Sequence, residues 1–356
     1  MRHPNTPVSR LATAAIVGCL SAVPSLHSAR AESAADFYKG KTVTLLVGGA
    51  AGGGYAIYAN ILAHHMGRHI PGNPKIIAQD YNGAGSLKAM KIVYNRSPRD
   101  GTVFAAVFMG AVMEPMLGDK GAEFDATKFT YLGSLNRETS ICIAWHTTPI
   151  KTFDDVFKQQ MIVGASGWTS SVRQFPTVLD NVIGTKFKVI SGYKGTQEVG
   201  LAVEKGETQG ICGYQWSSFS SGFSSWLAGN KVRILVQLAA NPHPAPSKLG
   251  VPMIWKYVKN KADERVLRLI FSQNTFGRPY VMPPGVPADR VAAMRAAFMA
   301  TTKDPAFLAE AAKAKVEINP VSGEEVEKLV KELYTASPDD VKRAKAALGT
   351  KPEKKS

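Results

Sequence analysis

Residues 42–55 of this 356-residue chain read TVTLLVGGAAGGGY, an apolar strand pattern that leads into five glycines and then a helical pattern. A helix is predicted after the glycines because Ile57 and Ile61 are four residues apart. Glycine allows the backbone to approach a ligand closely, and the first N–H groups of a helix have no partner within the helix. The turn between strand and helix is therefore a candidate site for an anion.

Two nucleotide-binding motifs fit this turn poorly. A dinucleotide fingerprint requires GxGxxG with an acidic residue about 20 residues later, but Gly49 is followed by Ala51 in place of the next glycine, and Asp80 lies too far along. A phosphate loop ends in Gly-Lys-Ser or Gly-Lys-Thr, whereas this turn ends in Gly54 and Tyr55. A tight turn without a ligand remains an alternative.

The N-terminus predicts export. Arg2 and Arg10 precede an apolar run at residues 11–20, and residues 29–31 read ARA, an A-x-A cleavage signal. The apolar run is shorter than the stretch of about 20 residues that spans a bilayer. We expect a signal peptide at residues 1–31, cleavage after Ala31, and a mature protein in the periplasm.

The chain is strongly basic, with 43 Lys and Arg against 28 Asp and Glu and a formal net charge of +15. Removal of residues 1–31 leaves 40 basic residues and a net charge of +12. Export and the dispersed placement of the basic residues argue against a nucleic-acid partner. A solvated basic surface explains most of these charges, and a small anionic ligand is compatible with them.

Two cysteines remain after cleavage, Cys142 and Cys212, and each lies in an apolar stretch with a strand pattern. Buried, unpaired thiols are the expectation for such positions, with a disulfide in the oxidising periplasm as the alternative.

The mature chain is longer than one hydrophobic core normally supports, so two domains are expected. Strand and helix patterns alternate, which predicts an α/β fold with mostly parallel sheets flanked by helices. The predicted strands are residues 42–47, 75–79, 102–107, 140–145, 161–165, 186–190, 208–214 and 232–238, and the predicted helices include residues 87–95, 171–183, 196–205 and 288–301.

Loops rich in glycine, serine and threonine follow several of these strands. They read QDYNGAGS at 79–86, VGASGWTSS at 163–171, YKGT at 193–196 and YQWSS at 214–218. Ligands of open α/β sheets bind outside the carboxyl ends of the strands, where such loops gather. Two domains that each present one such edge would enclose a cleft.

In this order, behind an export signal, the motifs resemble those of the periplasmic receptors of tripartite tricarboxylate transporters, also called Bug-type solute-binding proteins. The resemblance covers about residues 38–334. It rests on the glycine turn at 48–55, NGAG at 82–85, SPRDGT at 97–102, GASG at 164–167 with the serines at 170 and 171, YKG at 193–195, GVP at 250–252 and PPGVP at 283–287.

The resemblance implies a two-lobed, type II-like periplasmic binding protein with a ligand cleft between the lobes. The first lobe is expected at residues 36–140 and 239–336, the second at 141–238, and a C-terminal helix with a basic tail at 337–356. Such a receptor binds a small organic carboxylate, delivers it to the permease subunits of its transporter, and performs no chemistry. We expect a monomer without cofactor or metal.

The resemblance also implies site residues. Family members hold one carboxylate through backbone N–H groups of the first glycine turn and a Ser/Thr-rich loop of the other lobe, often with ordered waters. The corresponding positions are Gly52, Gly53, Gly54 and Tyr55, and opposite them Ser166, Thr169, Ser170 and Ser171. Further candidates from the loops after strands are Asn82, Trp168, Tyr193, Lys194, Gly195, Tyr214 and Trp216.

Two of these positions bear on the choice of ligand. Trp168 and Trp216 would either stack on a flat ligand or fill the core. Family members commonly carry an Asp directly after the glycines, and the Ala56 found here argues against an amino-acid ligand.

Groups suited to catalysis are scarce. No GxSxG motif is present, since GASGW at 164–168 lacks the second glycine at the required spacing. His65 and His69 are four residues apart, but they lie at a predicted helix end beside Arg68, where histidines usually serve the helix dipole. An exported enzyme acting on a small anionic substrate, or a ligand sensor that uses the same cleft, remains an alternative to a transport receptor.

Overall fold

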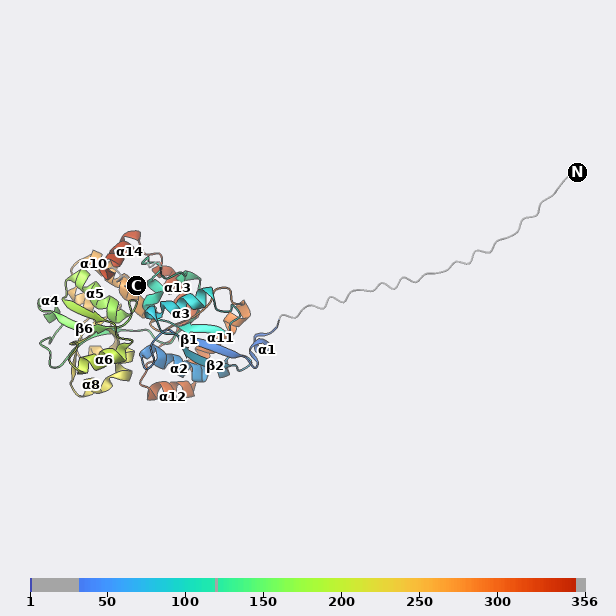
Figure 1. Ribbon diagram of the computed structural model, residues 1–356, viewed down its shortest axis with the longest axis horizontal. Helices are drawn as coiled ribbons and strands as arrows, with labels where there is room; N and C mark the ends of the chain where they lie inside the picture. Colours follow the sequence, from blue (N-terminus) through green and yellow to red (C-terminus); the bar gives the residue numbers. More distant parts are fainter. Residues whose placement is uncertain (2–31, 119–120, 350–356) are drawn as a thin grey trace. The chain divides into compact units, whose positions relative to one another are not determined.

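The computed structural model describes Met1 and residues 32–118 and 121–349, and residues 33–349 contain two β-sheets (Figure 1). Apart from Met1, the predicted signal peptide lies outside the described residues, and so does the end of the predicted basic tail from residue 350.

The first sheet has six strands in the order β11-β4-β10-β3-β1-β2. β1 (Thr42–Val47) pairs in parallel with β2 (Lys75–Asp80) on one side and with β3 (Val103–Ala106) on the other. β10 (Pro279–Met282) lies antiparallel between β3 and β4 (Thr130–Ser134). The two-residue strand β11 (Val321–Ser322) pairs antiparallel with β4 at the edge.

The second sheet has five strands in the order β7-β6-β8-β5-β9. β6 (Met161–Ala165) pairs in parallel with β7 (Phe187–Ser191) and with β8 (Gly210–Gln215). β5 (Ser140–Trp145) runs antiparallel to β8 and to β9 (Val232–Leu238). We call the first sheet with its helices the first lobe, and the second sheet with its helices the second lobe.

Helices flank both sheets. The α-helices are α1 (Ala34–Tyr38), α2 (Gly54–Met66), α3 (Leu87–Asn95), α4 (Asp155–Lys158), α5 (Ser171–Ile183), α6 (Thr196–Glu204), α7 (Trp216–Gly222), α8 (Ser224–Ala228), α9 (Pro244–Lys248), α10 (Lys261–Phe271), α11 (Ala288–Thr301), α12 (Pro305–Lys313), α13 (Gly323–Leu333) and α14 (Pro338–Leu348). The 3₁₀-helices are η1 (Gly67–His69), η2 (Ala84–Ser86), η3 (Met109–Met113), η4 (Ala126–Lys128), η5 (Ile254–Tyr257) and η6 (Ser272–Phe276).

The sheets are mixed, so the predicted mostly parallel arrangement is wrong in this respect. The difference comes from β4, β10 and β11, which the strand pattern did not reveal, and from the direction of β5. β10 has four residues and β11 has two, too few for a recognisable alternation of apolar and polar side chains.

Alternate side chains of β1 enter two different apolar layers. Val43, Leu45 and Val47 belong to a layer shared with α2, α11 and α12. Leu46, on the other face, belongs to a layer with side chains of α3 and α13, and that layer continues into the second lobe through Cys142 of β5 and side chains of α5, α10 and α14. One apolar layer is therefore shared by the two lobes.

The strands divide between the sheets at two crossings. β1–β4, β10 and β11 lie in the first sheet, whereas β5–β9 lie in the second. Helices α10 and α14 contact α5 of the second lobe, although both follow residue 239 in the chain. The lobe limits given above, 36–140 with 239–336 and 141–238, therefore stay a prediction.

Cys142 of β5 and Cys212 of β8 are joined in a disulfide, so the expectation of unpaired thiols is wrong. Antiparallel pairing of β5 with β8 places the two residues opposite each other. Because they are 70 residues apart in sequence, this pairing could not be read from the local pattern.

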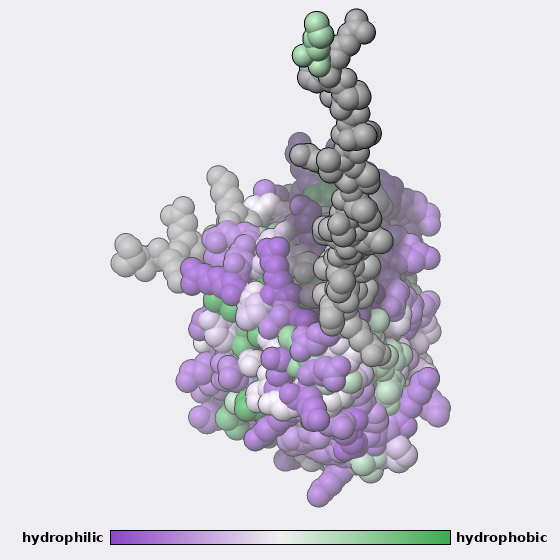
Figure 2. Space-filling model, turned by 90° about the vertical axis from the view of Figure 1, so that its right-hand side faces the viewer, coloured by the Kyte–Doolittle hydropathy of each residue, from purple (hydrophilic) through white to green (hydrophobic). Residues whose placement is uncertain are grey.

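The described surface is largely polar. The face shown in Figure 2 is mostly hydrophilic, with hydrophobic residues scattered over it in small groups. Large apolar side chains that are exposed after residue 32 lie on separate elements, at Ile77, Ile190, Leu201, Leu249 and Leu308. Among the described residues, none of the helices has the length and apolar character needed to cross a bilayer.

Asp180 near the end of α5 generates a prediction on stability. Its carboxylate accepts hydrogen bonds from Thr185 Oγ1 (2.6 Å) and from the Phe187 N–H (2.9 Å). Burial outweighs these bonds and raises the pKa of Asp180 to about 6. A carboxyl whose pKa is raised on folding stabilises the protein below its unfolded pKa, and this contribution is lost as the pH rises through the folded value.

We expect Asp180→Asn to unfold at higher urea concentration than the native protein at pH 7, but not at pH 4, with a difference on the order of 2 kcal/mol between the two conditions. Urea denaturation from pH 4 to pH 7 measures it. Asp155→Asn is the control, because backbone N–H groups lower the pKa of Asp155 and reverse the sign. A pH-independent effect of Asp180→Asn would contradict the assignment.

Candidate ligand-binding site

A pocket lies at the carboxyl ends of strands from both sheets, and about 520 Å³ of empty space, including its opening, is found there. The first lobe contributes the turns after β1 and β3, and the second lobe contributes the loops after β6, β7 and β8. The lining residues are Gly49, Ala50, Gly53, Gly54, Tyr55, Phe108, Met109, Gly110, Ser166, Thr169, Ser170, Ser171, Val172, Lys194, Gly195, Thr196, Gln215 and Ser218.

Three helices of nine or more residues begin at this pocket: α2, α5 and α6. The N-cap residues of α2 and α6 are Gly53 and Gly195, which have no side chain to cap the first N–H groups. The N-cap of α5 is Ser170, whose hydroxyl donates to the Gly167 carbonyl (2.7 Å) and makes no cap bond. Each helix start therefore keeps N–H groups and a partial positive charge for a ligand.

The charged side chains around the pocket reinforce this polarity. Lys194 lines the pocket, and no Asp or Glu is found among its lining residues in the described chain. The buried guanidinium of Arg278 lies directly behind Gly54, since a Cβ atom on Gly54 would be 3.2 Å from each of its terminal nitrogens. These groups favour an anion in the pocket, while the Glu198 carboxylate in the first turn of α6, which accepts from the Lys194 N–H (2.8 Å), offsets part of the positive charge there.

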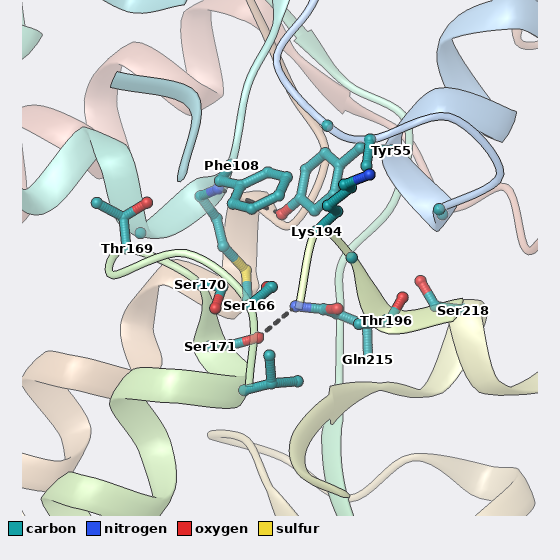
Figure 3. Close-up of a pocket in the computed structure, with 18 residues that line it drawn as sticks. Tyr55, Phe108, Ser166, Thr169, Ser170, Ser171, Lys194, Thr196, Gln215 and Ser218 are labelled. Carbon is teal, nitrogen blue, oxygen red and sulfur yellow. Dashed lines mark hydrogen bonds between the residues drawn. The ribbon is translucent and has the colours of Figure 1, made fainter. Parts of the chain in front are cut away.

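Three hydroxyl groups that follow β6, those of Thr169, Ser170 and Ser171, are already engaged. Thr169 Oγ1 donates to the Gly85 carbonyl, and Ser171 Oγ donates to the Gly213 carbonyl (2.6 Å). Ser171 Oγ also accepts from Gln215 Nε2 (2.6 Å), the bond drawn in Figure 3. These side chains fix the loop, and the backbone N–H groups at the start of α5 and the hydroxyl of Ser166 remain as donors facing the pocket.

Tyr55 and Phe108 form an apolar wall on one side of the pocket (Figure 3). Their ring centroids are 4.5 Å apart. The Tyr55 hydroxyl donates to the Gly277 carbonyl (3.0 Å) and accepts from the Met109 N–H (3.3 Å). Burial raises the pKa of Tyr55 to about 12, so the phenol stays neutral and both bonds persist at physiological pH.

The chain was compared with known proteins. No family model matches it, and no curated protein matches it in sequence. Among solved structures, the periplasmic binding protein BugD superposes with a TM-score of 0.69 at 19% identity, covering 87% of this chain and 98% of BugD. The chain has the fold of periplasmic binding proteins. The predicted two-lobed architecture is thereby confirmed.

Two further structures of this fold are similar over most of their length. A protein from R. palustris solved with adipate has a TM-score of 0.66 at 16% identity, covering 85% of this chain and 97% of that protein. MatC from Rhodopseudomonas palustris, solved with malate, has a TM-score of 0.65 at 17% identity, covering 86% of this chain and 99% of MatC. At these identities the similarity is one of fold.

Within this fold, most of the residues predicted to bind ligand do line the pocket. They are Gly53, Gly54, Tyr55, Ser166, Thr169, Ser170, Ser171, Lys194 and Gly195. Six predicted residues lie outside it: Gly52, Asn82, Trp168, Tyr193, Tyr214 and Trp216. The contacts of the aromatic residues explain their placement.

Tyr214 and Trp216 belong to the core of the second lobe. The Tyr214 ring packs near Phe219, with centroids 6.3 Å apart. Trp216 Nε1 donates to Glu317 Oε1 (3.1 Å) in the first lobe, away from the pocket. The side chain of Trp168 lies under the guanidinium of Arg173, 5.1 Å from ring centroid to cation. None of these three rings lines the pocket.

The other three predicted residues outside the pocket lining are Tyr193, Asn82 and Gly52. The hydroxyl of Tyr193 donates to Glu207 Oε2 (3.4 Å), and the backbone N–H of Asn82 donates to Asp80 Oδ1 (2.9 Å). Gly52 has a positive φ of 74°, so the turn before α2 requires glycine there for its backbone conformation.

Sequence reasoning did not select half of the lining residues. Thr196, Gln215 and Ser218 lie in loops that had been noted, but the aromatic residues beside them were chosen instead. Phe108, Met109 and Gly110 follow the predicted strand at 102–107, and the position of that loop after a strand was the available signal. The remaining ones are Gly49, Ala50 and Val172.

The two lobes contact each other beside the pocket. Besides the bonds of Thr169 to Gly85 and of Trp216 to Glu317, Gln174 Nε2 of α5 donates to Glu114 Oε1 (2.9 Å) of the first lobe. The pocket thus lies beside surfaces of the two lobes that already meet.

The histidines at the end of α2 pair with acidic residues of the α12 segment. His65 Nε2 lies 2.6 Å from Glu310 Oε2, and His69 Nε2 lies 2.7 Å from Asp304 Oδ2. Nowhere in the described chain do three or more His, Cys, Asp or Glu side chains come together in a way that could hold a metal ion.

Gly54 generates a second prediction. A Cβ atom there would lie within 2.1 Å of Ser218 Oγ and would force this side chain and Arg278 to move. At Gly53 the nearest atom is the Ala50 carbonyl oxygen at 3.1 Å. We expect Gly54→Ala to reduce the free energy of unfolding by about 1–3 kcal/mol and Gly53→Ala to reduce it less.

Urea denaturation of the single variants and of Gly54→Ala with Ser218→Ala measures the effect. Removal of Ser218 Oγ relieves part of the overlap. The double variant should therefore lose less free energy of unfolding than the two single variants lose together, by about 1 kcal/mol. Additive effects would show that Ser218 does not occupy the space above Gly54.

Proposed function

We propose that this protein is the exported receptor of a tripartite tricarboxylate-type transporter, which binds a small organic carboxylate between its lobes and delivers it to the permease. The observation that carries this proposal is the convergence of three uncapped helix starts, those of α2, α5 and α6, on one pocket free of carboxylates.

Electrostatics favours an anion in the pocket. Each helix start carries about half a positive charge, and an anion there gains typically 0.3–1 kcal/mol, more where it is partly buried. Backbone N–H groups of α2 from one lobe and of α5 and α6 from the other would bond to the same ligand. Lys194 adds a full positive charge from the second lobe.

The apolar part of the lining favours an organic anion over an inorganic one. Tyr55, Phe108, Met109 and Val172 line the pocket beside the helix starts. A carboxylate with a carbon skeleton would place its charge at the N–H groups and bury its carbon atoms against these side chains. Phosphate or sulfate would leave the apolar wall without a partner.

The fold and the N-terminal sequence support the compartment and the role. Structures of the same fold include periplasmic binding proteins solved with adipate and with malate. The A-x-A signal at residues 29–31 supports release into the periplasm. The order of motifs from the glycine turn to PPGVP at 283–287 supports membership of the Bug-type receptors, and we propose that the protein acts as a monomer.

The pocket provides little for catalysis. No histidine or carboxylate is found among its described lining residues to act as a general base. The hydroxyls of Thr169, Ser170 and Ser171 donate to backbone carbonyls instead of to a base. These observations favour a receptor over an exported enzyme. A sensor that uses the same pocket would be recognised by the absence of permease genes beside its own.

The proposal predicts binding of a carboxylate. The mature protein is titrated by calorimetry with adipate, malate, citrate and benzoate, with adipamide as a neutral control. We expect at least one acid to bind, and at a hundredfold excess over its Kd to stabilise the protein by about 2.7 kcal/mol. Adipamide should not bind. If none of the acids gives a heat of binding or raises the melting temperature, the proposal is contradicted. Chemical conversion of a bound acid would favour an enzyme.

Lys194 provides a separate prediction. Its side chain is exposed at the pocket, so its attraction for an anion is weak and screened by salt. We expect Lys194→Ala to weaken binding by about two- to fivefold at low ionic strength. The loss should shrink in 0.5 M NaCl, where the Debye length is only about 4 Å. Lys205→Ala removes the same charge from the far end of α6 and is the control. A loss that is equally large at both salt concentrations would instead indicate direct contact with the ligand.

A further inference from the structure

Two adjacent serines at the start of α7 share one buried arginine. Nη2 of Arg278 donates to Ser217 Oγ (2.8 Å) and to Ser218 Oγ (2.7 Å). Nε of Arg278 donates to Glu138 Oε1 (2.8 Å). Arg278 is 1% exposed, so this cluster is shielded from water. Ser218 lines the ligand pocket, whereas Ser217 does not.

The two hydroxyls differ in where their protons go. Ser217 Oγ accepts a hydrogen bond from Arg278 and donates its proton to Glu138 Oε1, so its donor is already used. Ser218 Oγ accepts from Arg278, and within the described chain no protein group accepts its proton. Because Ser218 lines the pocket, the unused donor is available to a ligand.

Arg278 brings a full positive charge to the same place. Burial disfavours its charged form, but Glu138 and the nearby tyrosines outweigh this and keep the pKa of Arg278 above its usual value. Its guanidinium lies 4.3 Å from the ring centroid of Tyr55 and 4.8 Å from that of Tyr58. Its Nη1 is buried and has no hydrogen-bond partner.

This cation lies behind the first residue of α2, next to the positive end of the helix dipole. Two positive fields side by side are unfavourable unless an anion is present. Glu138 offsets part of the charge from the opposite side, at Nε. Within the described chain, neither Nη1 nor Nη2 of Arg278 bonds to a carboxylate.

We propose that Ser218 donates a hydrogen bond to an oxygen of the ligand's ionised carboxylate at the start of α2, and that Arg278 orients this hydroxyl as a positioning residue. The inference rests on the function proposed above. It specifies that the group held at this end of the pocket is a carboxylate and not an ester or amide, because a hydroxyl polarised by a cation favours a charged acceptor.

The test compares Ser218→Ala with the matched variant Ser217→Ala. Both remove one acceptor of Arg278, but only the first removes a donor from the pocket. Calorimetry is carried out with adipate, malate, citrate and benzoate. For each acid that the native protein binds, its amide is added as a neutral probe, together with the half-amide of any diacid. We expect Ser218→Ala to lose tenfold or more in affinity for the acid and to discriminate less between acid and amide. Ser217→Ala should lose less than threefold.

Arg278→Lys and Arg278→Met extend the test where the variants fold. Lysine retains the charge and should retain most of the preference for the acid over its amide, whereas methionine should abolish it. A merely structural role of Arg278 would change stability and leave this preference unchanged.

The outcomes separate this inference from the proposed function. If the native protein binds an acid and Ser218→Ala binds it equally well, the inference is overturned and the receptor function stands. Equal losses in the two serine variants would also overturn it, since the effect would then come from the shared arginine. If the native protein binds none of the acids, both proposals fail together.

Discussion

The buried ion pair of Glu138 with Arg278 joins the two segments that cross between the lobes. Glu138 lies between β4 and β5, and Arg278 lies between η6 and β10. Each charge would cost several kcal/mol to bury alone, so the pair is tolerated only when both crossings lie together. The same guanidinium packs against Tyr55 and Tyr58 of α2. One buried contact thus joins both crossing segments to the start of α2.

The pocket shows how a protein can prepare an anion site with a single charged side chain, Lys194, among its described lining residues. The starts of α2 and α6 have glycine at the N-cap, and α5 has a serine whose hydroxyl bonds elsewhere. Donors that would otherwise be satisfied by the protein are left for a ligand. The hydroxyls of Thr169, Ser170 and Ser171 are tied to the carbonyls of Gly85, Gly167 and Gly213. The site is therefore ordered before the ligand arrives, which lowers the entropy lost on binding.

Local patterns in the sequence predicted the long elements well. The helices at residues 87–95, 171–183 and 288–301 and the strands at 161–165 and 232–238 have the predicted limits. What the sequence could not provide was the direction of strands whose partners are distant. β10 follows β3 by more than 170 residues yet lies beside it, and the disulfide between Cys142 and Cys212 depends on the same kind of remote pairing. Such contacts are set by the packing of whole lobes and leave no local periodicity.

The glycine turn shows that distant contacts also decide the role of single residues, which the local sequence could not predict. Its glycines were interpreted together as a surface for a ligand, but the structure gives them different reasons. Gly52 is required by its positive φ, and Gly53 lines the pocket with little crowding behind it. Gly54 is required because Ser218 and Arg278 fill the space of a side chain. The packing behind Gly54 thus links it to Arg278, which is more than 200 positions away in the sequence. A glycine that admits an arginine from within the protein lines the pocket on its other side, so Gly54 belongs to both the core packing and the pocket.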